Sequence, residues 1–479
     1  MKSELDPKIG VIGAGASGTA LLYELFRQFK HDLPQVVLID GGSQWGRGTV
    51  YLEDMDCALV NRQAKHMSLL FDDQPDFLRW IEQNPKEISQ AVEQQYFTRA
   101  TFGKYVEQRL NAIENLWVDS GGVFKNINEF VERVEETGNT VQISLPSQKL
   151  EVDYLVLCTG HGPQRPFTRF SGEMLNPYPL RELCTAVRGV SHVAVVGTGL
   201  TAIDCVLALL ESNTSLRVSM FSRSGIIPDI RAEFEEDLPL TQPERTDHTG
   251  ATLKELELKF IAELAAYNVS LTDLSGYVTK LRRGASNLFD PVPAIESHRR
   301  IQNLSISIAN RDLPVYWHGF SDQDRMLFYD RYYRFLQAVT APIPLSVAHK
   351  LRNAMSTGQL EVRNGTVERR GGAFRISSAA KKERYEVIID ATGRLTNAGQ
   401  VDFEKMLITS GAALEELYGG ICVDRRSGRI KRPDSKVSRV YGIGYVTRGS
   451  LLYSSSLYQA TRNIKTAVAN IKASVNGQE

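Results

Sequence analysis

The sequence predicts an α/β protein built on parallel β-sheets. Short runs rich in valine, isoleucine and leucine alternate with helical stretches along most of the chain. A glycine-rich turn joins a strand to a helix at two places that lie far apart in the sequence. The length, 479 residues, exceeds what one hydrophobic core usually supports. We therefore expect two domains whose central strands are buried on both faces.

Local patterns place the individual elements. Short apolar runs predict buried strands at Lys8–Ile12, Gln35–Ile39, Asp153–Cys158, His192–Val196, Leu216–Phe221 and Glu386–Asp390. Helical spacing of apolar residues predicts helices over 16–29, 102–117, 200–212, 252–267, 322–339, 344–356 and 455–472. Alternating apolar positions predict a β-meander over 123–152 and a hairpin over 359–377, the latter with turns at Asn364-Gly365 and Gly371-Gly372.

The first glycine-rich turn follows the first predicted strand and reads Gly13-Ala14-Gly15-Ala16-Ser17-Gly18. This is the Gly-x-Gly-x-x-Gly spacing of a dinucleotide-binding turn in its strand–turn–helix context. Gly13 permits the tight turn, Gly15 lets a pyrophosphate approach the backbone, and Gly18 lets the helix pack on the strand. The first N–H groups of the helix then face the anion. Asp40 ends the next strand, where its carboxylate can accept hydrogen bonds from a ribose diol.

The second glycine-rich turn follows the strand His192–Val196 and reads Gly197-Thr198-Gly199-Leu200-Thr201-Ala202. Alanine in the third position is a tolerated variant. The next strand ends in Ser222-Arg223-Ser224 instead of an acid, and an arginine there can bind a 2′-phosphate. One such turn is a weak signal, because glycine-rich turns also serve only to pack a helix on a sheet. Two of them in the same context indicate two nucleotide sites, each in a Rossmann-like domain.

Two nucleotide sites of different polarity indicate two different dinucleotides. We expect FAD as a bound cofactor in the first site and NADPH as the reductant in the second. Two predicted strands run into the turns Thr159-Gly160 and Thr392-Gly393, and we expect both turns to return the chain to the sheet of the first site. Gly444 precedes the C-terminal helix, whose N-terminal dipole is expected to face the flavin ring.

These assignments divide the chain into a discontinuous FAD domain and an inserted NADPH domain. We expect the first part of the FAD domain at 1–170 and its second part at 381–479. The NADPH domain then occupies 171–380 and includes a helical insertion at about 225–358. Aromatic residues gather at Tyr316–Leu336, where their helical spacing indicates either a packed face or a lid that keeps water from a reactive flavin.

Charge and cysteine content exclude several other classes of protein. Lysine plus arginine (56) equals aspartate plus glutamate (56), so the whole surface does not attract nucleic acid. Five cysteines, none near another in sequence, argue against a disulfide framework and for a reducing cytoplasm. We find no signal peptide and no apolar run of the roughly 18 residues that span a membrane. No His or Cys spacing suits a metal ion, so we expect no metal site. From the charge balance and the lack of a long apolar run, we also expect no nucleic-acid partner and no membrane partner.

Several short stretches carry a resemblance to a known group of proteins. They are Gly13–Gly18, Trp45-Gly46-Arg47-Gly48, Asn61 with Met67, Arg99 with Phe102-Gly103 and Tyr105, Gly197–Asp204, Thr447–Tyr453 and Gln459-Ala460. With them the chain resembles the flavoproteins that have two dinucleotide-binding domains. Within these it looks like the FAD/NAD(P)-binding proteins related to flavin-dependent urate hydroxylase and aspartate N-hydroxylase. The resemblance extends along the chain and is weakest from about 225 to 385.

The resemblance implies FAD in the first fold, NAD(P)H in the second and oxygen-dependent hydroxylation. The segment Trp45–Tyr51, with Gly46 and Gly48, has a backbone permissive enough to wrap the FAD, and a plain loop is the alternative. We expect Trp45, Arg47 and Gly48 to contact the FAD, with Val131 in the same site. Asn61 is the candidate catalytic residue, and the resemblance places it in hydrogen-bonding contact with the isoalloxazine. On spacing alone, Asn61 would be a surface residue.

We therefore expect an FAD- and NADPH-dependent monooxygenase that hydroxylates a small polar, nitrogen-bearing substrate with O₂ through a peroxyflavin. An NAD(P)H-dependent flavin reductase that passes electrons on without oxygenation is an alternative. A non-enzymatic flavoprotein that senses redox state is another. The absence of a Cys-x-x-Cys pair excludes only the disulfide-exchanging reductases.

Overall fold

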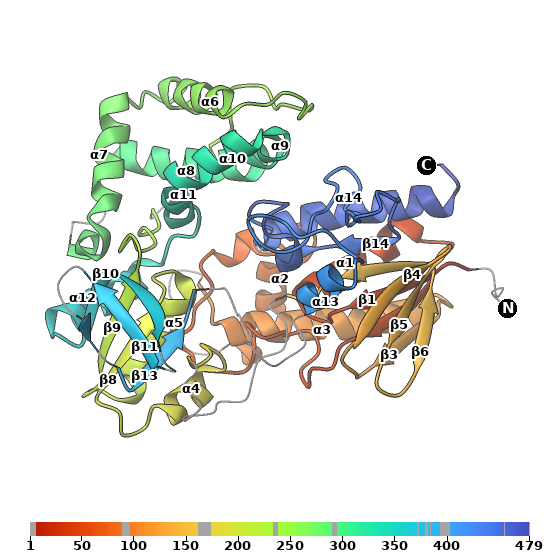
Figure 1. The fold of residues 1–479 in the computed structure, drawn as a ribbon, viewed down its shortest axis with the longest axis horizontal. Helices are drawn as coiled ribbons and strands as arrows, with labels where there is room; N and C mark the ends of the chain where they lie inside the picture. Colours follow the sequence, from red (N-terminus) through yellow and green to blue (C-terminus); the bar gives the residue numbers. More distant parts are fainter. Residues whose placement is uncertain are drawn as a thin grey trace. The chain divides into compact units, whose positions relative to one another are not determined.

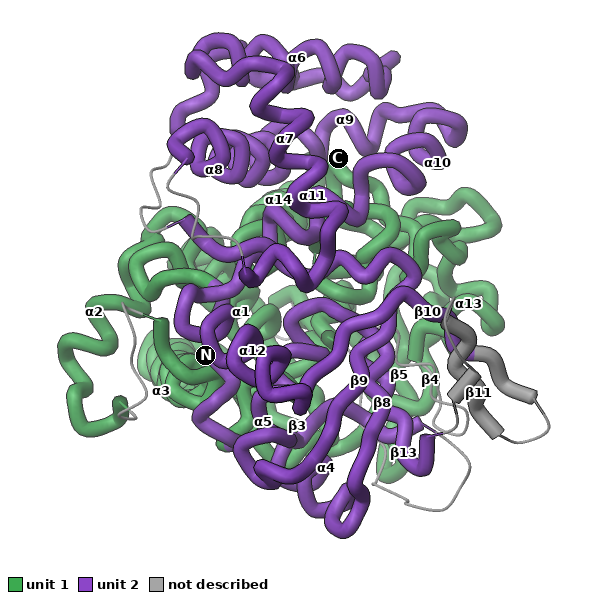
Figure 2. Tube along the Cα trace, turned by 90° about the vertical axis from the view of Figure 1, so that its left-hand side faces the viewer, with its two compact units in different colours: residues 1–53, 62–164, 397–479 green, residues 54–61, 165–396 purple. Residues whose placement is uncertain are grey.

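A computed structural model of the protein describes residues 6–88, 96–160, 174–232, 238–289, 295–370, 373–378, 382–383, 385–392, 403–454 and 456–478. The chain forms two compact units, which Figure 2 shows in different colours. Unit 1 comprises residues 1–53, 62–164 and 397–479, and unit 2 comprises residues 54–61 and 165–396. Each unit has its own sheet with a parallel core, which confirms the predicted α/β class.

Unit 1 is built on a five-stranded parallel sheet. Its strand order is β14 (Val440–Gly442), β7 (Tyr154–Leu157), β1 (Lys8–Ile12), β2 (Gln35–Ile39) and β3 (Phe124–Ile127). The strands β1 and β2 have the predicted bounds and are buried beyond their first residues. Helix α1 (Ala16–Phe29) packs against α3 (Arg99–Asp119) and α14 (Leu457–Val475) (Figure 1). The shorter helices of this unit are η1 (Ala64–His66), α2 (Asp76–Gln83), η2 (Pro85–Glu87), α13 (Phe403–Thr409) and η4 (Gly444–Thr447).

The sequence predicts a β-meander over 123–152, but the first strand of this segment belongs to the parallel sheet of unit 1 instead. The strands β4 (Arg133–Thr137), β5 (Thr140–Ser144) and β6 (Lys149–Val152) pair antiparallel in a sheet of their own. β3 instead pairs parallel with β2, because α3 carries the chain back to that edge of the main sheet. Val134, Val141 and Ile143 point from the small sheet into the core that the main sheet also lines.

Unit 2 is built on a six-stranded mixed sheet. Its strand order is β12 (Lys382–Glu383), β11 (Ala373–Ser378), β10 (Leu360–Arg370), β9 (Arg217–Ser222), β8 (His192–Val196) and β13 (Val387–Asp390). The strands β10, β9, β8 and β13 run parallel to one another. Strands β11 and β12 extend the sheet beyond β10 with antiparallel pairing. Helix α5 (Leu200–Ser212) packs on β8 and β9 and against α4 (Leu180–Ala186).

Two predictions for this sheet are wrong. The sequence predicts the first sheet for the strand before Thr392, whereas Val387–Asp390 pairs with β8 along its whole length. The predicted return to the FAD domain at residue 381 is therefore too early. The predicted turn at Asn364-Gly365 does not form, because β10 continues through both residues while it pairs first with β9 and then with β11.

Helices form most of the chain between β9 and β10. They are α6 (Leu253–Ala266), α7 (Leu271–Arg282), η3 (Gly284–Phe289), α8 (Glu296–Arg311), α9 (Leu313–Gly319), α10 (Asp322–Arg331), α11 (Tyr333–Thr340) and α12 (Leu345–Ser356). Helices α6 and α7 each begin with a capping box. The box of α6 pairs Thr252 with Glu255, and the box of α7 pairs Ser270 with Asp273. Helices α7 and α8 are not predicted by the sequence, because serine, threonine, glycine and asparagine interrupt their apolar periodicity. The helix predicted over 322–339 divides at Tyr332.

The aromatic segment of this helical region is a packed face. Trp317 and Phe328 are buried and meet edge to face, with ring centroids 5.8 Å apart. Phe335 packs against a neighbouring core that contains Tyr277 and Leu304. The packing interpretation therefore accounts for Trp317, Phe328 and Phe335, whereas Tyr332 is 36% exposed.

A buried charge network ties the helical region to the chain that follows β9. Asp229 is 2% exposed and accepts hydrogen bonds from Tyr277 Oη at 2.5 Å, Lys280 Nζ at 3.0 Å and Gln302 Nε2 at 3.0 Å. Tyr277 and Lys280 come from α7, and Gln302 comes from α8. The Gln302 side chain also accepts from Ala232 N at 3.0 Å. One carboxylate thus holds two helices against one loop.

Replacing Asp229 with leucine should lower the free energy of unfolding by about 3–5 kcal/mol, because Lys280 would stay buried without its opposite charge. The double variant Asp229→Leu with Lys280→Met should recover most of this loss, since neither charge is then buried. Urea unfolding followed by tryptophan fluorescence measures both. Equal losses in the single and double variants would show that the ion pair is not what stabilises this region.

Candidate functional site

The first glycine-rich turn lies where β1 ends. Gly13 has a φ of +106°, and a Cβ there would lie 2.3 Å from the carbonyl oxygen of Cys158. A Cβ at Gly18 would lie 2.0 Å from the Gly13 carbonyl oxygen. The fold itself therefore requires both of these glycines. Gly15 differs, because its φ is −81° and a Cβ there would lie 3.6 Å from Gly48 Cα, an ordinary contact.

Four neighbouring strands of unit 1 bring the predicted residues to one edge of the sheet. Gly13 follows β1, Asp40 follows β2, Thr159 and Gly160 follow β7, and Gly444 follows β14. In open α/β sheets nucleotides bind outside the carboxyl ends of the strands, which is this edge. Helix α1 begins at the same edge, so its free N–H groups are available to an anion.

Two further contacts shape this edge. Asp40 fixes the glycine-rich turn, since its Oδ2 accepts from Ala14 N at 2.7 Å and its Oδ1 accepts from Gly42 N at 2.7 Å. Each carboxylate oxygen can accept a second hydrogen bond, as a ribose diol requires. Gly444 has a φ of +75°, and a Cβ there would lie 3.2 Å from Ser17 Oγ, so the C-terminal segment reaches the first turn of α1.

The loop Trp45–Gly48 lies directly on the glycine-rich turn. Gly46 N donates to Ala14 O at 2.7 Å. A Cβ at Gly48 would lie 3.7 Å from Gly15 Cα. Gly46 and Gly48 have φ angles of +88° and +59°, which other residues rarely adopt. The loop is therefore placed to cover whatever binds at Gly15.

Arg47 is the buried cation of this loop, and 9% of it is exposed. Its Nε and Nη2 donate to Oε2 of Glu107 on α3, at 2.9 and 2.7 Å. Its Nη1 is buried and has no hydrogen-bond partner in the part of the chain that the structure describes. A phosphate oxygen is the acceptor that a guanidinium suits best. The residues of this edge thus fit a cofactor that carries a pyrophosphate.

The second glycine-rich turn repeats this geometry in unit 2. Gly197 has a φ of +123°, and a Cβ there would lie 2.4 Å from the carbonyl oxygen of Ala391. At Gly199, the residue before α5, no atom of the described residues lies within 4 Å of a Cβ position. Leu200 and Thr201 begin α5. Thr392, which follows β13, therefore lies at the edge of this second site rather than the first one. Gly393 lies outside the described residues.

Thr198 holds the loop that follows β9. Its hydroxyl lies 2.6 Å from Ile226 O and 3.1 Å from Ser222 Oγ. Ser222 Oγ also accepts from Gly225 N at 2.9 Å. Arg223, at the tip of this loop, is exposed and forms no ion pair with the described residues. The backbone of the loop that carries Arg223 therefore lies beside the second turn, and the contact of Arg223 with a nucleotide stays a prediction.

This loop has a close neighbour that the sequence does not predict. Gly284 has a φ of +60°, and a Cβ there would lie 2.5 Å from Gly225 O. This close approach brings the end of α7, with Arg283, to the Arg223 loop. A glycine just after the helix is the sequence signal for such an approach, but it does not say which segment is approached.

Asn61 and its neighbours belong to unit 2. The unit includes residues 54–61, and the Asn61 carbonyl oxygen accepts from Nη2 of Arg231 at 2.6 Å. Asp54 Oδ1 accepts from Arg181 N at 2.9 Å. Placing Asn61 at the flavin stays a prediction.

Val131 is half-buried and packs against the core of unit 1. Its neighbour Phe130 was not singled out by the sequence, because an isolated aromatic residue carries no pattern. Phe130 is 54% exposed, and a Cβ at Gly41 would lie 2.5 Å from its ring. An exposed aromatic ring therefore lies beside Asp40, at the predicted ribose position.

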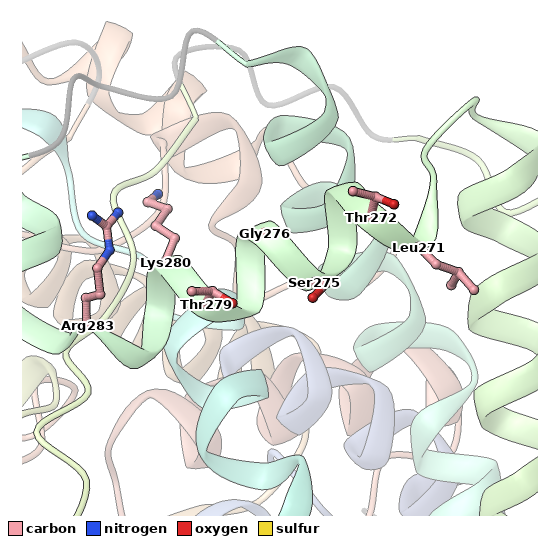
Figure 3. Close-up of a pocket in the computed structure, with 7 residues that line it drawn as sticks. All are labelled: Leu271, Thr272, Ser275, Gly276, Thr279, Lys280 and Arg283. Carbon is pink, nitrogen blue, oxygen red and sulfur yellow. The ribbon is translucent and has the colours of Figure 1, made fainter.

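A shallow groove of about 530 Å³ runs along α7 in unit 2 (Figure 3). It is lined by Leu271, Thr272, Ser275, Gly276, Thr279, Lys280 and Arg283. Lys280 is engaged by Asp229, so the other polar side chains of the groove are the hydroxyls of Thr272, Ser275 and Thr279 and the guanidinium of Arg283. A second, polar hollow of about 390 Å³ lies at the start of β8 and β9, where His192 Nε2 and Ser219 Oγ are 2.8 Å apart. That hollow is at the opposite end of these strands from the glycine-rich turn.

The remaining sequence features concern membranes, metals and thiols. None of the helices that the structure describes has the length and hydropathy of a membrane span. Within the described ranges, no three His, Cys, Asp or Glu side chains converge as metal ligands do. None of the five cysteines forms a disulfide. Burial raises the pKa of the Cys158 thiol well above its ordinary value, as expected for an inert core cysteine.

Comparison with known proteins agrees with this geometry. Residues 10–162 match the profile of a family described as FAD-NAD(P)-binding. No curated protein sequence matches the chain. Among solved structures, three similar ones are ornithine N-hydroxylase from Kutzneria sp. 744 (16% identity, TM-score 0.56, 99% of both chains covered), L-lysine 6-monooxygenase from Pseudomonas syringae (13%, 0.57, 98% of this chain and 99% of that one) and the cadaverine monooxygenase from Erwinia amylovora (13%, 0.57, 97% and 94%).

At these identities the likeness shows a shared fold. The chain therefore has the fold of the flavoproteins with two dinucleotide-binding units, and residues 10–162 match the FAD-NAD(P)-binding profile. The predicted resemblance to FAD/NAD(P)-binding flavoproteins is confirmed at this level.

Gly15→Val should abolish FAD binding while the protein still folds, because the valine would occupy the approach of the pyrophosphate but meets no close contact. Gly13→Val is the contrasting variant, and it should fail to fold because its Cβ collides with the backbone at Cys158. Flavin content after purification and a thermal melt measure the two effects. A Gly15→Val protein that retains a full complement of FAD would place the cofactor elsewhere.

Proposed function

We propose that the protein is an FAD-dependent, NADPH-consuming monooxygenase that hydroxylates a small, polar, nitrogen-containing substrate. The observation that carries the proposal is the pair of glycine-rich turns in separate units. One has an aspartate after its second strand and the other has an arginine. The proposal is supported by the fold that the chain shares over nearly its whole length with hydroxylases of ornithine, lysine and cadaverine.

Unit 1 would bind the FAD. The start of α1 and the room at Gly15 would hold the pyrophosphate, Asp40 would hold the ribose, and the loop Trp45–Gly48 would cover them. FAD, when bound, supplies the electron transfer and the activation of O₂, which no amino-acid side chain provides. The protein's part is to orient the partners and to keep water out.

Unit 2 would bind NADPH at the second turn. The exposed Arg223 would meet the 2′-phosphate, which carries about −1.5 to −2 charges, and Ser222 or Ser224 would add a hydroxyl donor. The proposal places the protein in the cytoplasm, where five free cysteines stay reduced.

The proposed reaction is tested by comparing NADPH consumption with product formation. FAD-loaded protein receives NADPH, O₂ and one amine, either ornithine, lysine, cadaverine or aspartate. We expect one of these classes to accelerate NADPH oxidation and to yield a hydroxylated product in a near-equal amount, measured by mass spectrometry. NADPH oxidation that no amine accelerates, without hydroxylated product, would favour the flavin reductase.

Arg223→Ala should weaken NADPH roughly 10- to 150-fold, because a charged hydrogen bond contributes about 1.5–3 kcal/mol. NADH has no 2′-phosphate and should be used equally by both proteins. Arg217→Ala is the matched control, since Arg217 is exposed at the other end of β9. The rate of flavin reduction at varied NADPH and NADH concentrations measures the effect. Equal losses for both nucleotides, or no loss for either, would remove Arg223 from the site.

A further inference from the structure

We infer that Glu107 of α3 is a positioning residue, which holds the Arg47 guanidinium in place for the pyrophosphate of the dinucleotide that unit 1 binds. The inference rests on the proposed FAD site. It assigns a role to a helix that lies outside the glycine-rich motif and far from it in sequence.

The loop that carries Arg47 is seated on one face of α3. A Cβ at Gly46 would lie 2.5 Å from Glu107 Cα, and a Cβ at Gly103 would lie 1.9 Å from Tyr51 O. Gly103 and Glu107 are four residues apart, so both contacts come from the same face of the helix. The loop therefore meets α3 at two points at backbone distance, and neither point has room for a side chain.

The same loop is also fixed to the glycine-rich turn. Gly46 N donates to Ala14 O, and Gly48 lies against Gly15. Arg47 is the residue between these two glycines. Its backbone is thus held at the turn, and the direction of its guanidinium depends on what its side chain contacts.

Glu107 sets that direction. Nε and Nη2 form one edge of the planar guanidinium, and both donate to the same oxygen, Oε2 of Glu107. Nη1 then faces away from the carboxylate, and it is the buried nitrogen that has no partner among the described residues. The Arg47 side chain is 10% exposed and the Glu107 side chain is 42% exposed, so the carboxylate reaches the buried cation from the solvent side.

A simpler role for Glu107 is to neutralise a buried charge, and the two roles predict opposite results. If Glu107 only neutralises Arg47, removing its negative charge makes the site more positive and tightens the binding of an anionic cofactor. If Glu107 positions Arg47, removing it lets the guanidinium turn away, and binding weakens.

The experiment measures the dissociation constant of FAD from the full-length apoprotein by flavin fluorescence. Arg47→Met should weaken FAD by about 10-fold or more, because a charge-assisted hydrogen bond is lost. Glu107→Ala should weaken it as well, and Glu107→Gln should weaken it less, since the amide oxygen still accepts. Glu114→Ala, on the same helix but bonded to Asn126, is the matched control and should bind FAD as the wild type does.

A double variant separates positioning from a general structural effect. Arg47→Met with Glu107→Ala should bind FAD no more weakly than Arg47→Met alone, because Glu107 acts through Arg47. Additive losses, or tighter binding in Glu107→Ala, would overturn the inference while wild-type binding stands. Failure of the wild-type chain to bind FAD would overturn the proposed function together with it.

Discussion

Both units depend on one backbone contact. In unit 1 the turn at Gly13 lies against the carbonyl of Cys158, and in unit 2 the turn at Gly197 lies against the carbonyl of Ala391. A Cβ would stand 2.3 and 2.4 Å from these oxygens, so only glycine fits at either position. The contact joins the end of the first strand to the end of its parallel neighbour. It leaves the glycine two residues further along, Gly15 or Gly199, open toward the edge where nucleotides bind.

The two sites diverge in what surrounds this shared contact. Unit 1 places an aspartate and a buried arginine around its turn, and the arginine is held by a glutamate from α3. Unit 2 places an exposed arginine on a loop that Thr198 and the approach of Gly284 hold in shape. Under the proposed function, one fold element would serve two nucleotides, and these flanking residues would select between them.

The sequence predicts the bounds of the strands and helices around each glycine-rich turn well. It predicts poorly which strands and side chains pair with one another. The bounds of β1, β2, β8, α1 and α5 match the prediction, because glycine turns mark their ends and apolar periodicity marks their length. The sheet to which Val387–Asp390 belongs could not be predicted, since Thr159-Gly160 and Thr392-Gly393 give the same local pattern in both units. The partner of Arg47 lies 60 residues away on α3, and no local pattern indicates a pairing at that distance. The place of Asn61 in unit 2 is likewise a tertiary property.

The most direct test of two distinct dinucleotide sites is a pair of equilibrium titrations on one preparation. The apoprotein is titrated with FAD, and the FAD-loaded protein is then titrated with NADP⁺ by calorimetry. The structure predicts one FAD per chain, followed by one NADP⁺ that binds without displacing the flavin and that Gly199→Val abolishes. Release of FAD by NADP⁺, or NADP⁺ binding that survives Gly199→Val, would contradict the account.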